Sequence, residues 1–133
     1  MNFTLALLLL VVATQTQASQ DYLCPSTESC QTETNCKPHV VHSILSIEAN
    51  LNLLSFGSAT YPRDTCASYE MQPNSGITKY IGLGGAKDAV GAQSFVLFQN
   101  MEFILTSAVQ VEVGGKEKAV GLLVWGVCER AVS

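Results

Sequence analysis

The sequence predicts a small secreted α+β domain, in which one amphipathic helix packs on an antiparallel β-meander and disulfide bonds stabilise the whole. Three observations predict this fold. Apolar residues recur at helical spacing between residues 38 and 54, apolar and polar residues alternate from Glu102 to Val113, and five cysteines follow an apolar amino-terminal segment. One helix, one sheet and covalent links between them are therefore expected.

Residues 1–18 predict a secretory signal peptide. The first twenty residues contain no charged side chain, an apolar run extends from Leu5 to Ala13, and the small Ala18 precedes Ser19 as a cleavage site. The run is shorter than the roughly twenty residues that cross a bilayer, so no membrane span is expected. Residues 19–133 are then expected to form a single extracellular domain.

The charge of the chain argues against nucleic acid as a partner. The formal net charge is −4, charged residues make up 14 % of the sequence, and the seven Lys and Arg residues do not cluster. Binding to phosphates needs a basic surface, which this pattern does not supply. An unknown extracellular protein or a small apolar ligand is the expected kind of partner.

Five cysteines in an oxidising compartment predict two disulfide bonds and one odd thiol. They are Cys24, Cys30, Cys36, Cys66 and Cys128. The pairing stays open, but a bridge from the amino-terminal cluster to the last strand is expected, because closing a long loop removes more entropy from the unfolded chain. The odd thiol either is buried and inert or joins a second chain in a disulfide-linked dimer, and a catalytic thiol is the least favoured alternative.

The first elements are predicted from polarity and spacing. Residues 19–37 are polar and without period, which predicts an extended segment held by the disulfide bonds. After Pro38, an apolar stripe predicts a helix of about sixteen residues that ends before Gly57. The stripe consists of Val40, Ile44, Ile47, Leu51 and Leu54. Residues 58–75 contain two prolines among polar residues and predict a long connection.

The carboxyl-terminal half predicts the sheet. Residues 77–83 and 94–98 are short strand candidates, and Glu102–Val113 alternates with period two before Gly114-Gly115. An apolar stretch follows, so a hairpin is expected. A three-residue loop from Gly114 to Lys116 is preferred, since it places Glu112 opposite Lys118 and not opposite Glu117. The last strand is apolar on both sides, so both of its faces must be covered.

No catalytic residue, metal site or cofactor is expected. His39 and His42 are the only histidines and form C-x2-H-x2-H with Cys36, but a zinc site would need a fourth ligand and a reduced cysteine. No nucleophile-elbow motif occurs, and the glycine-rich stretch at residues 82–91 lacks the spacing of a phosphate loop and predicts a flexible turn. The chain is therefore predicted not to be an enzyme.

The sequence alone favours a secreted domain that binds an extracellular partner in a defence, toxin, effector or signalling role. An alternative is an extracellular carrier of a small apolar ligand, because a helix over a curled sheet can enclose a pocket. The residues expected to line it are Ile104, Val120, Leu122 and Val124.

A further alternative comes from the segment "QVEVG", Gln110 to Gly114. It resembles the Q-x-V-x-G pattern that cystatins carry on a hairpin tip, which enters the cleft of a cysteine protease. The resemblance covers five residues and implies inhibition of such a protease.

Overall fold

The described part of the chain is built almost entirely of β-strands. In the computed structural model it comprises residues 19–32, 34–60, 66–74, 76–85 and 91–131, and these ranges contain no α-helix. None of their residues belongs to a helix long and apolar enough to cross a membrane. The predicted signal peptide and residues 86–90 of the predicted glycine-rich turn lie outside the described residues.

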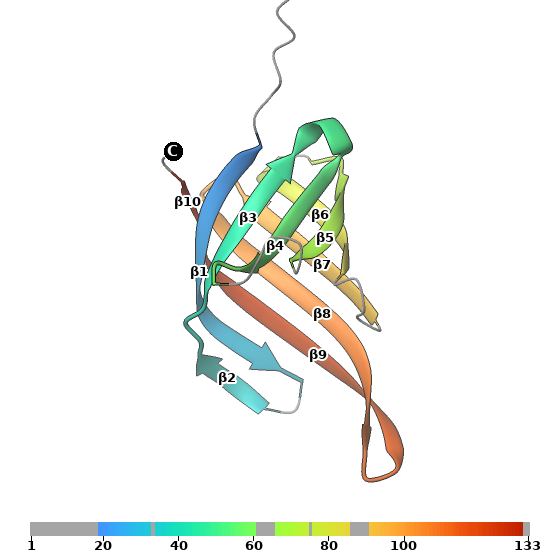
Figure 1. The fold of residues 1–133 in the computed structure, drawn as a ribbon. Coiled ribbons are helices and arrows are strands. Elements are labelled where there is room, and N and C mark those ends of the chain that lie inside the picture. The colour runs from blue at the N-terminus through green and yellow to red at the C-terminus, as the bar shows by residue number, and fades with distance from the viewer. Residues whose placement is uncertain (1–18, 33, 61–65, 75, 86–90, 132–133) are drawn as a thin grey trace, which may run out of the picture.

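The strands follow one another with short connections (Figure 1). They are β1 (Gln20–Gln31), β2 (Thr34–Pro38), β3 (His42–Glu48), β4 (Leu53–Ser58), β5 (Ala67–Gln72), β6 (Thr78–Gly85), β7 (Gly91–Phe98), β8 (Glu102–Val113), β9 (Lys116–Val127) and β10 (Glu129–Arg130). A 3₁₀ turn, η1 (Ala49–Leu51), separates β3 from β4.

Eight of these strands close into an antiparallel barrel. Their order is β1-β3-β4-β5-β6-β7-β8-β9, and β9 pairs back with β1. The first strand closes the barrel by changing partners: residues 20–25 pair with β3 and residues 26–31 pair with β9. A bulge between Ser26 and Glu28 marks the change, as expected where a strand must bend. The short strands β2 and β10 both pair with β1.

The predicted α+β fold is wrong, because the predicted helix is a β-hairpin. Residues 42–58 form β3 and β4, with Asn52 in a left-handed conformation (φ 53°) at the turn between them. The same segment also carries apolar residues at every second position, namely Leu45 and Ile47 in β3 and Leu54 and Phe56 in β4, and tertiary pairing decides between the two patterns. The hairpin buries Leu45 and Leu54 completely and leaves Phe56 only 8 % exposed, because these side chains face the barrel interior.

The two polar segments both contribute strands: the extended segment at residues 19–37 is part of the sheet, and the prediction of a long connection at residues 58–75 is wrong. The segment at residues 19–37 contains β1, whose buried Tyr22, Cys24 and Ser26 alternate with more exposed neighbours. The predicted connection at residues 58–75 contains β5, which pairs with both β4 and β6. The closed barrel buries Ser and Tyr together with aliphatic side chains. The inward-facing positions of these segments are therefore partly polar, and the strand alternation is not visible in their hydrophobicity.

The β8–β9 hairpin is present, but the predicted three-residue loop is wrong. The loop consists of Gly114 and Gly115, whose φ angles are 59° and 78°. Two central residues with positive φ form the turn that matches the twist of paired strands. Glu112 therefore lies opposite Glu117, and both carboxylates are exposed to water. The turn geometry outweighs the weak repulsion of two solvated charges.

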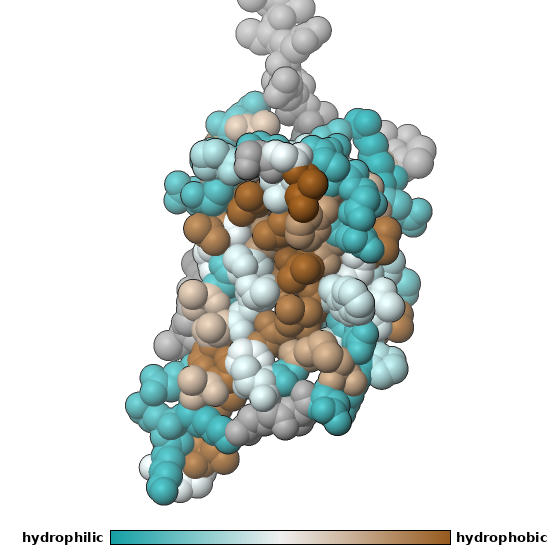
Figure 2. Space-filling view, turned by 180° about the vertical axis from the view of Figure 1, so that it is seen from behind, coloured by the Kyte–Doolittle hydropathy of each residue, from teal (hydrophilic) through white to brown (hydrophobic). Residues whose placement is uncertain are grey.

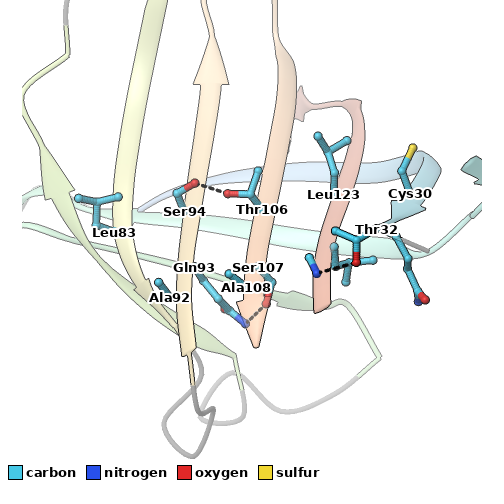
Figure 3. A pocket seen from close by; sticks show the side chains of 13 residues that line it. Cys30, Thr32, Leu83, Ala92, Gln93, Ser94, Thr106, Ser107, Ala108 and Leu123 are labelled. Atoms are coloured by element: carbon cyan, nitrogen blue, oxygen red, sulfur yellow. Dashed lines mark hydrogen bonds between the residues drawn. The ribbon is translucent and has the colours of Figure 1, made fainter. Parts of the chain in front are cut away.

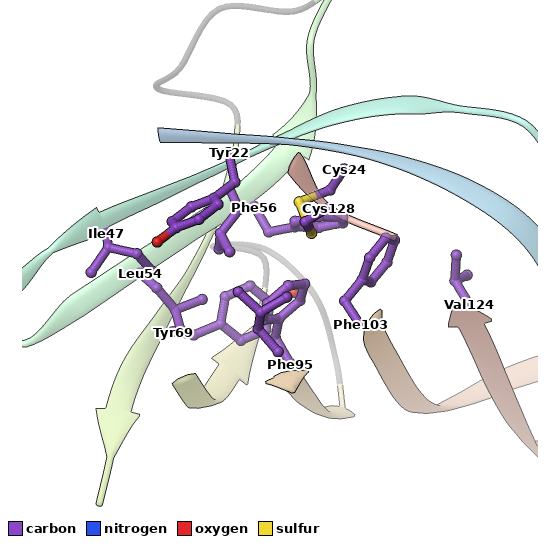
Figure 4. Packing of buried hydrophobic residues seen from close by; sticks show 12 residues of the cluster. Tyr22, Cys24, Ile47, Leu54, Phe56, Tyr69, Phe95, Phe103, Val124 and Cys128 are labelled. Atoms are coloured by element: carbon purple, nitrogen blue, oxygen red, sulfur yellow. A yellow bond between two sulfur atoms is a disulfide. The ribbon is translucent and has the colours of Figure 1, made fainter. Parts of the chain in front are cut away.

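The core fills the middle of the barrel with aromatic rings (Figure 4). The ring centroid of Phe56 lies 4.8 Å from that of Phe95 and 5.5 Å from that of Phe103. Gly126 makes room for this cluster, because a Cβ there would lie 2.8 Å from Phe103 and would collide with the carbonyl oxygen of Pro25. A glycine in β9 thus lets β1 and Phe103 approach closely.

The predicted disulfide bonds are present and both begin in β1. Cys24 is bonded to Cys128 after β9, and Cys30 is bonded to Cys36 in β2. Such bonds are typical of extracellular proteins. Cys66 is free and half-buried against Gly57, where an added Cβ would lie 2.5 Å from the Cys66 sulfur. Whether this thiol joins a second chain stays a prediction.

Candidate functional site

A cavity of about 310 Å³ lies inside the barrel, beside the aromatic core. Alternation along the strands points the lining side chains inward from β1, β3, β4, β5, β7, β8 and β9. Two more residues come from the link between β2 and β3. The lining residues are Ser26, His39, Val41, Ser43, Phe56, Gly57, Ser58, Ala67, Tyr69, Gln93, Leu105 and Val124. We call this space the inner cavity.

The inner cavity has an apolar floor. Phe56 lines it and also belongs to the aromatic cluster with Phe95 and Phe103, so the core closes the barrel beneath the cavity. Leu105 and Val124 are directly paired on β8 and β9 and add an aliphatic wall. A ligand here would bury apolar surface against a rigid, fully packed base.

Ser26 and His39 form the first polar group of the cavity. The Ser26 hydroxyl oxygen accepts a hydrogen bond from the Val41 amide (3.0 Å) and lies 2.8 Å from the His39 carbonyl oxygen and 2.9 Å from Nδ1 of His39. A hydroxyl has one proton to donate and can accept two hydrogen bonds. All three contacts are satisfied together when the hydroxyl donates to the carbonyl and Nδ1 carries the ring proton.

Tyr69 and Gln93 form the second polar group. The Tyr69 hydroxyl donates to Oε1 of Gln93 (3.0 Å), and Nε2 of Gln93 donates to the Ser107 hydroxyl (3.3 Å). Burial raises the pKa of Tyr69 from 10.0 to about 12, because the phenolate would lose its hydration. The hydroxyl therefore remains a donor at physiological pH, and the glutamine amide is held in one orientation.

A larger hollow of about 540 Å³ lies over the outer side of β7, β8 and β9 (Figure 3). Small side chains, among them Ala92, Ala108 and Gly121, make its base. Its hydroxyl groups are already paired, since Ser94 and Thr106 bond to each other at 2.5 Å and Thr32 accepts from the Gly121 amide. This outer groove therefore offers little that would orient a ligand, and the inner cavity is the stronger candidate despite its smaller volume.

The outer side of the barrel also carries a row of apolar side chains, three of them half-buried and one exposed. Figure 2 shows hydrophobic side chains gathered in a band on the face seen from behind. On the sheet, Ile81, Val96, Ile104 and Trp125 are successive cross-strand neighbours from β6 to β9. Trp125 is 46 % exposed. An apolar row of this kind is typical of a surface that contacts another molecule.

The structure separates the residues that the sequence predicted to line a ligand pocket. Val124 lines the inner cavity, and Leu122 packs against the core from the same inward face of β9. Val120 shares that face farther along the strand and is half-buried. Ile104 instead points outward, directly opposite Trp125. Three of the four residues thus face the interior and one faces the outside.

The other residues singled out in the sequence lie apart from one another. Cys36 is bonded to Cys30 and offers no thiolate to a metal, while His42 is exposed at the start of β3. The "QVEVG" segment lies at the tip of the β8–β9 hairpin, where Val111 is 38 % and Val113 is 60 % exposed. The tip extends beyond the last pairs that β8 forms with β7 and that β9 forms with β1 (Figure 1).

Sequence reasoning missed the polar residues of the inner cavity. Ser26, Tyr69 and Gln93 lie in segments without a clean hydrophobic alternation, so none was identified as inward-facing. A signal existed in Tyr22, Cys24 and Ser26, which occupy every second position and are all buried.

Compared with known proteins, the chain matches no family model, no curated protein and no solved structure.

Proposed function

We propose that this protein is an extracellular carrier of one small, mainly apolar molecule. The observation that carries the proposal is the inner cavity of about 310 Å³ within a closed eight-stranded barrel. A barrel of eight strands is just wide enough to hold one small ligand, and barrel mouths are common ligand sites. The volume is roughly twice that of a ~150 Å³ cavity that binds benzene, which fits a molecule larger than one ring.

Export supports the same proposal. The charge-free apolar segment before residue 19 predicts secretion, and two disulfide bonds suit an oxidising compartment. Carriage needs no catalytic group, and the sequence predicts none. A sparingly soluble molecule outside the cell would gain a soluble, covalently stabilised container.

Partner binding remains the second candidate. The sequence alone favours partner binding over carriage of a ligand. The inner cavity is the reason that carriage is now placed first. The outward row that contains Ile104 and Trp125 supports a protein-binding face. Inhibition of a cysteine protease would rest on the exposed hairpin tip and has less support, because only the five-residue resemblance points to it.

The carrier proposal is tested by filling the cavity. Ala67 lines the inner cavity, whereas its neighbour Ser68 is exposed on the outer side of the same strand. Titration with the fluorescent probe N-phenyl-1-naphthylamine should show binding to the unaltered chain, and Ala67→Phe should weaken it by about tenfold or more, because the added ring occupies the ligand's space. Ser68→Phe is the matched control and should bind the probe normally.

A third variant tests whether the probe binds in the outer groove and not in the inner cavity. Ala108→Phe fills the outer groove and should leave probe binding unchanged. Absence of probe binding to the unaltered chain would contradict the proposal, and so would equal binding by the Ala67→Phe and Ser68→Phe variants.

A further inference from the structure

We propose that the inner cavity selects a neutral ligand with a hydroxyl group at one end of an apolar body, and that Nε2 of His39 accepts the hydrogen bond from this hydroxyl. The inference deepens the proposed function and rests on it. It identifies the chemical class of the ligand and the residue that recognises its polar end.

The described lining of the cavity favours an uncharged ligand. The twelve described residues that line it include no Asp, Glu, Lys or Arg. A carboxylate or ammonium group enclosed here would lose its hydration without gaining a partner of opposite charge, which is costly. A neutral polar group needs only one hydrogen bond to offset its desolvation.

The protein already uses most of the cavity's polar groups. The Ser26 hydroxyl makes its three contacts to Val41 and His39, and the Tyr69 hydroxyl donates to Gln93. The Gln93 amide in turn donates to Ser107. Ser58 shares a hydrogen bond with Thr60, so the Ser43 hydroxyl and the imidazole of His39 are the lining groups left to recognise a ligand. A hydroxyl can donate or accept, whereas a ring nitrogen without a proton can only accept, so His39 is the group that would select a hydrogen-bond donor.

The Ser26 network assigns the tautomer of His39. Because the hydroxyl proton of Ser26 is directed to the His39 carbonyl, the ring nitrogen Nδ1 must donate to the Ser26 oxygen. In the neutral ring Nε2 then carries a lone pair and acts as an acceptor. Among the described residues Nε2 has no hydrogen-bond partner, so a ligand hydroxyl would complete the hydrogen bonding of the ring.

The chemistry therefore specifies both ends of the ligand. Its polar end donates a hydrogen bond to His39, and its body packs against Phe56, Leu105 and Val124. A molecule that keeps the body but lacks the donor should bind more weakly, because the acceptor would then be buried without a partner. An alcohol and its methyl ether keep the same body and differ in this donor and in one added methyl group.

The test compares three competitors for displacement of N-phenyl-1-naphthylamine: decan-1-ol, its methyl ether and decanoate. The alcohol should displace the probe at about tenfold lower concentration than the ether, and decanoate at neutral pH should be the weakest. His39→Phe should reduce the preference for alcohol over ether to about one. The matched control is His42→Phe, which changes an exposed histidine outside the cavity and should keep the preference.

Nuclear magnetic resonance of the unaltered chain supplies a second readout that does not depend on folding of a variant. The resonances of the two ring nitrogens of His39 should show that Nδ1 carries the proton. Addition of decan-1-ol should shift the Nε2 resonance. A proton found on Nε2 in the neutral ring would overturn the inference.

The outcomes separate this inference from the proposed function. If no probe binds, the carrier proposal itself fails. If the probe binds but alcohol and ether compete equally, carriage stands and the hydroxyl selectivity is wrong. If the alcohol is preferred and His39→Phe leaves the preference intact, the assignment to His39 is wrong.

Discussion

At the scale of single residues, Tyr69 connects the core to the inner cavity. Its side chain is 1 % exposed, its ring centroid lies 6.4 Å from that of Phe95, and its hydroxyl donates to Gln93. Gly82 makes this packing possible, since a Cβ there would lie 2.7 Å from the Cβ of Tyr69. Stability and cavity shape therefore depend on the same side chain.

The raised pKa of Tyr69 predicts sensitivity to alkaline pH. Its pKa is about 12 in the folded protein and 10.0 without burial, so the unfolded chain releases this proton first. The resulting stabilisation is fully present below pH 10 and is lost as the pH rises toward 12. We expect a loss on the order of 2 kcal/mol from this residue, measured by urea unfolding across that range.

The Tyr69→Phe variant isolates this contribution. It should lose less stability than the unaltered chain between pH 10 and pH 12, although part of the loss should remain, because burial also raises the pKa of Tyr22 to about 12. Equal losses in the two proteins would show that Tyr69 does not cause the alkaline transition.

At the scale of elements, the sequence predicts strands well where alternation is uninterrupted and poorly where polar residues face inward. The β8–β9 hairpin is visible because Glu102–Val113 alternates cleanly before two glycines. The β3–β4 hairpin is not, since Ser43 and Ser46 are both buried and its apolar residues also fit a helical stripe. Local pattern cannot decide between two periods when pairing with β1 and β5 selects one of them.

The same limit applies to the candidate site. The sequence predicts one group of residues correctly as sharing a face of a strand, namely Val120, Leu122 and Val124. The polar lining could not be predicted, since Ser26 and Gln93 line the same cavity only after β1 pairs with β9. Closure of the barrel brings together residues that lie far apart in the sequence, and no local sequence pattern connects them.

The tip of the β8–β9 hairpin should behave as a separate local unit. Residues 110–119 pair only with each other in the described sheet, and their turn needs positive φ at Gly115 (78°). Gly115→Val should strain the turn and raise amide hydrogen exchange at residues 110–119 by about tenfold. Exchange in β7 should stay unchanged, because the core strands open only with the whole barrel.

Gly114→Asn is the matched control for the turn. Asparagine adopts left-handed φ readily, so exchange at the tip should remain near that of the unaltered chain. A fall in global stability with Gly115→Val would contradict the local interpretation, since it would place the tip within the cooperative unit.

At the scale of the whole molecule, the two disulfide bonds should differ in their effect on stability. The Cys24–Cys128 bond closes a sequence separation of 104 residues, and the Cys30–Cys36 bond closes one of 6. On loop entropy alone, Cys24→Ala with Cys128→Ala should lower the free energy of unfolding by about 4–5 kcal/mol, and Cys30→Ala with Cys36→Ala by about 2 kcal/mol. Urea unfolding under non-reducing conditions measures both, and equal losses would contradict the entropic explanation.

The pairing of β1 with β9 has a consequence for how the chain is made. The ribosome releases β1 first, but the strand that pairs with its residues 26–31 is β9, almost a hundred residues later. Until β9 emerges, the nascent sheet has two open edges, which chaperones must shield or which attract other chains. Closure of the barrel therefore waits until β9 has been synthesised.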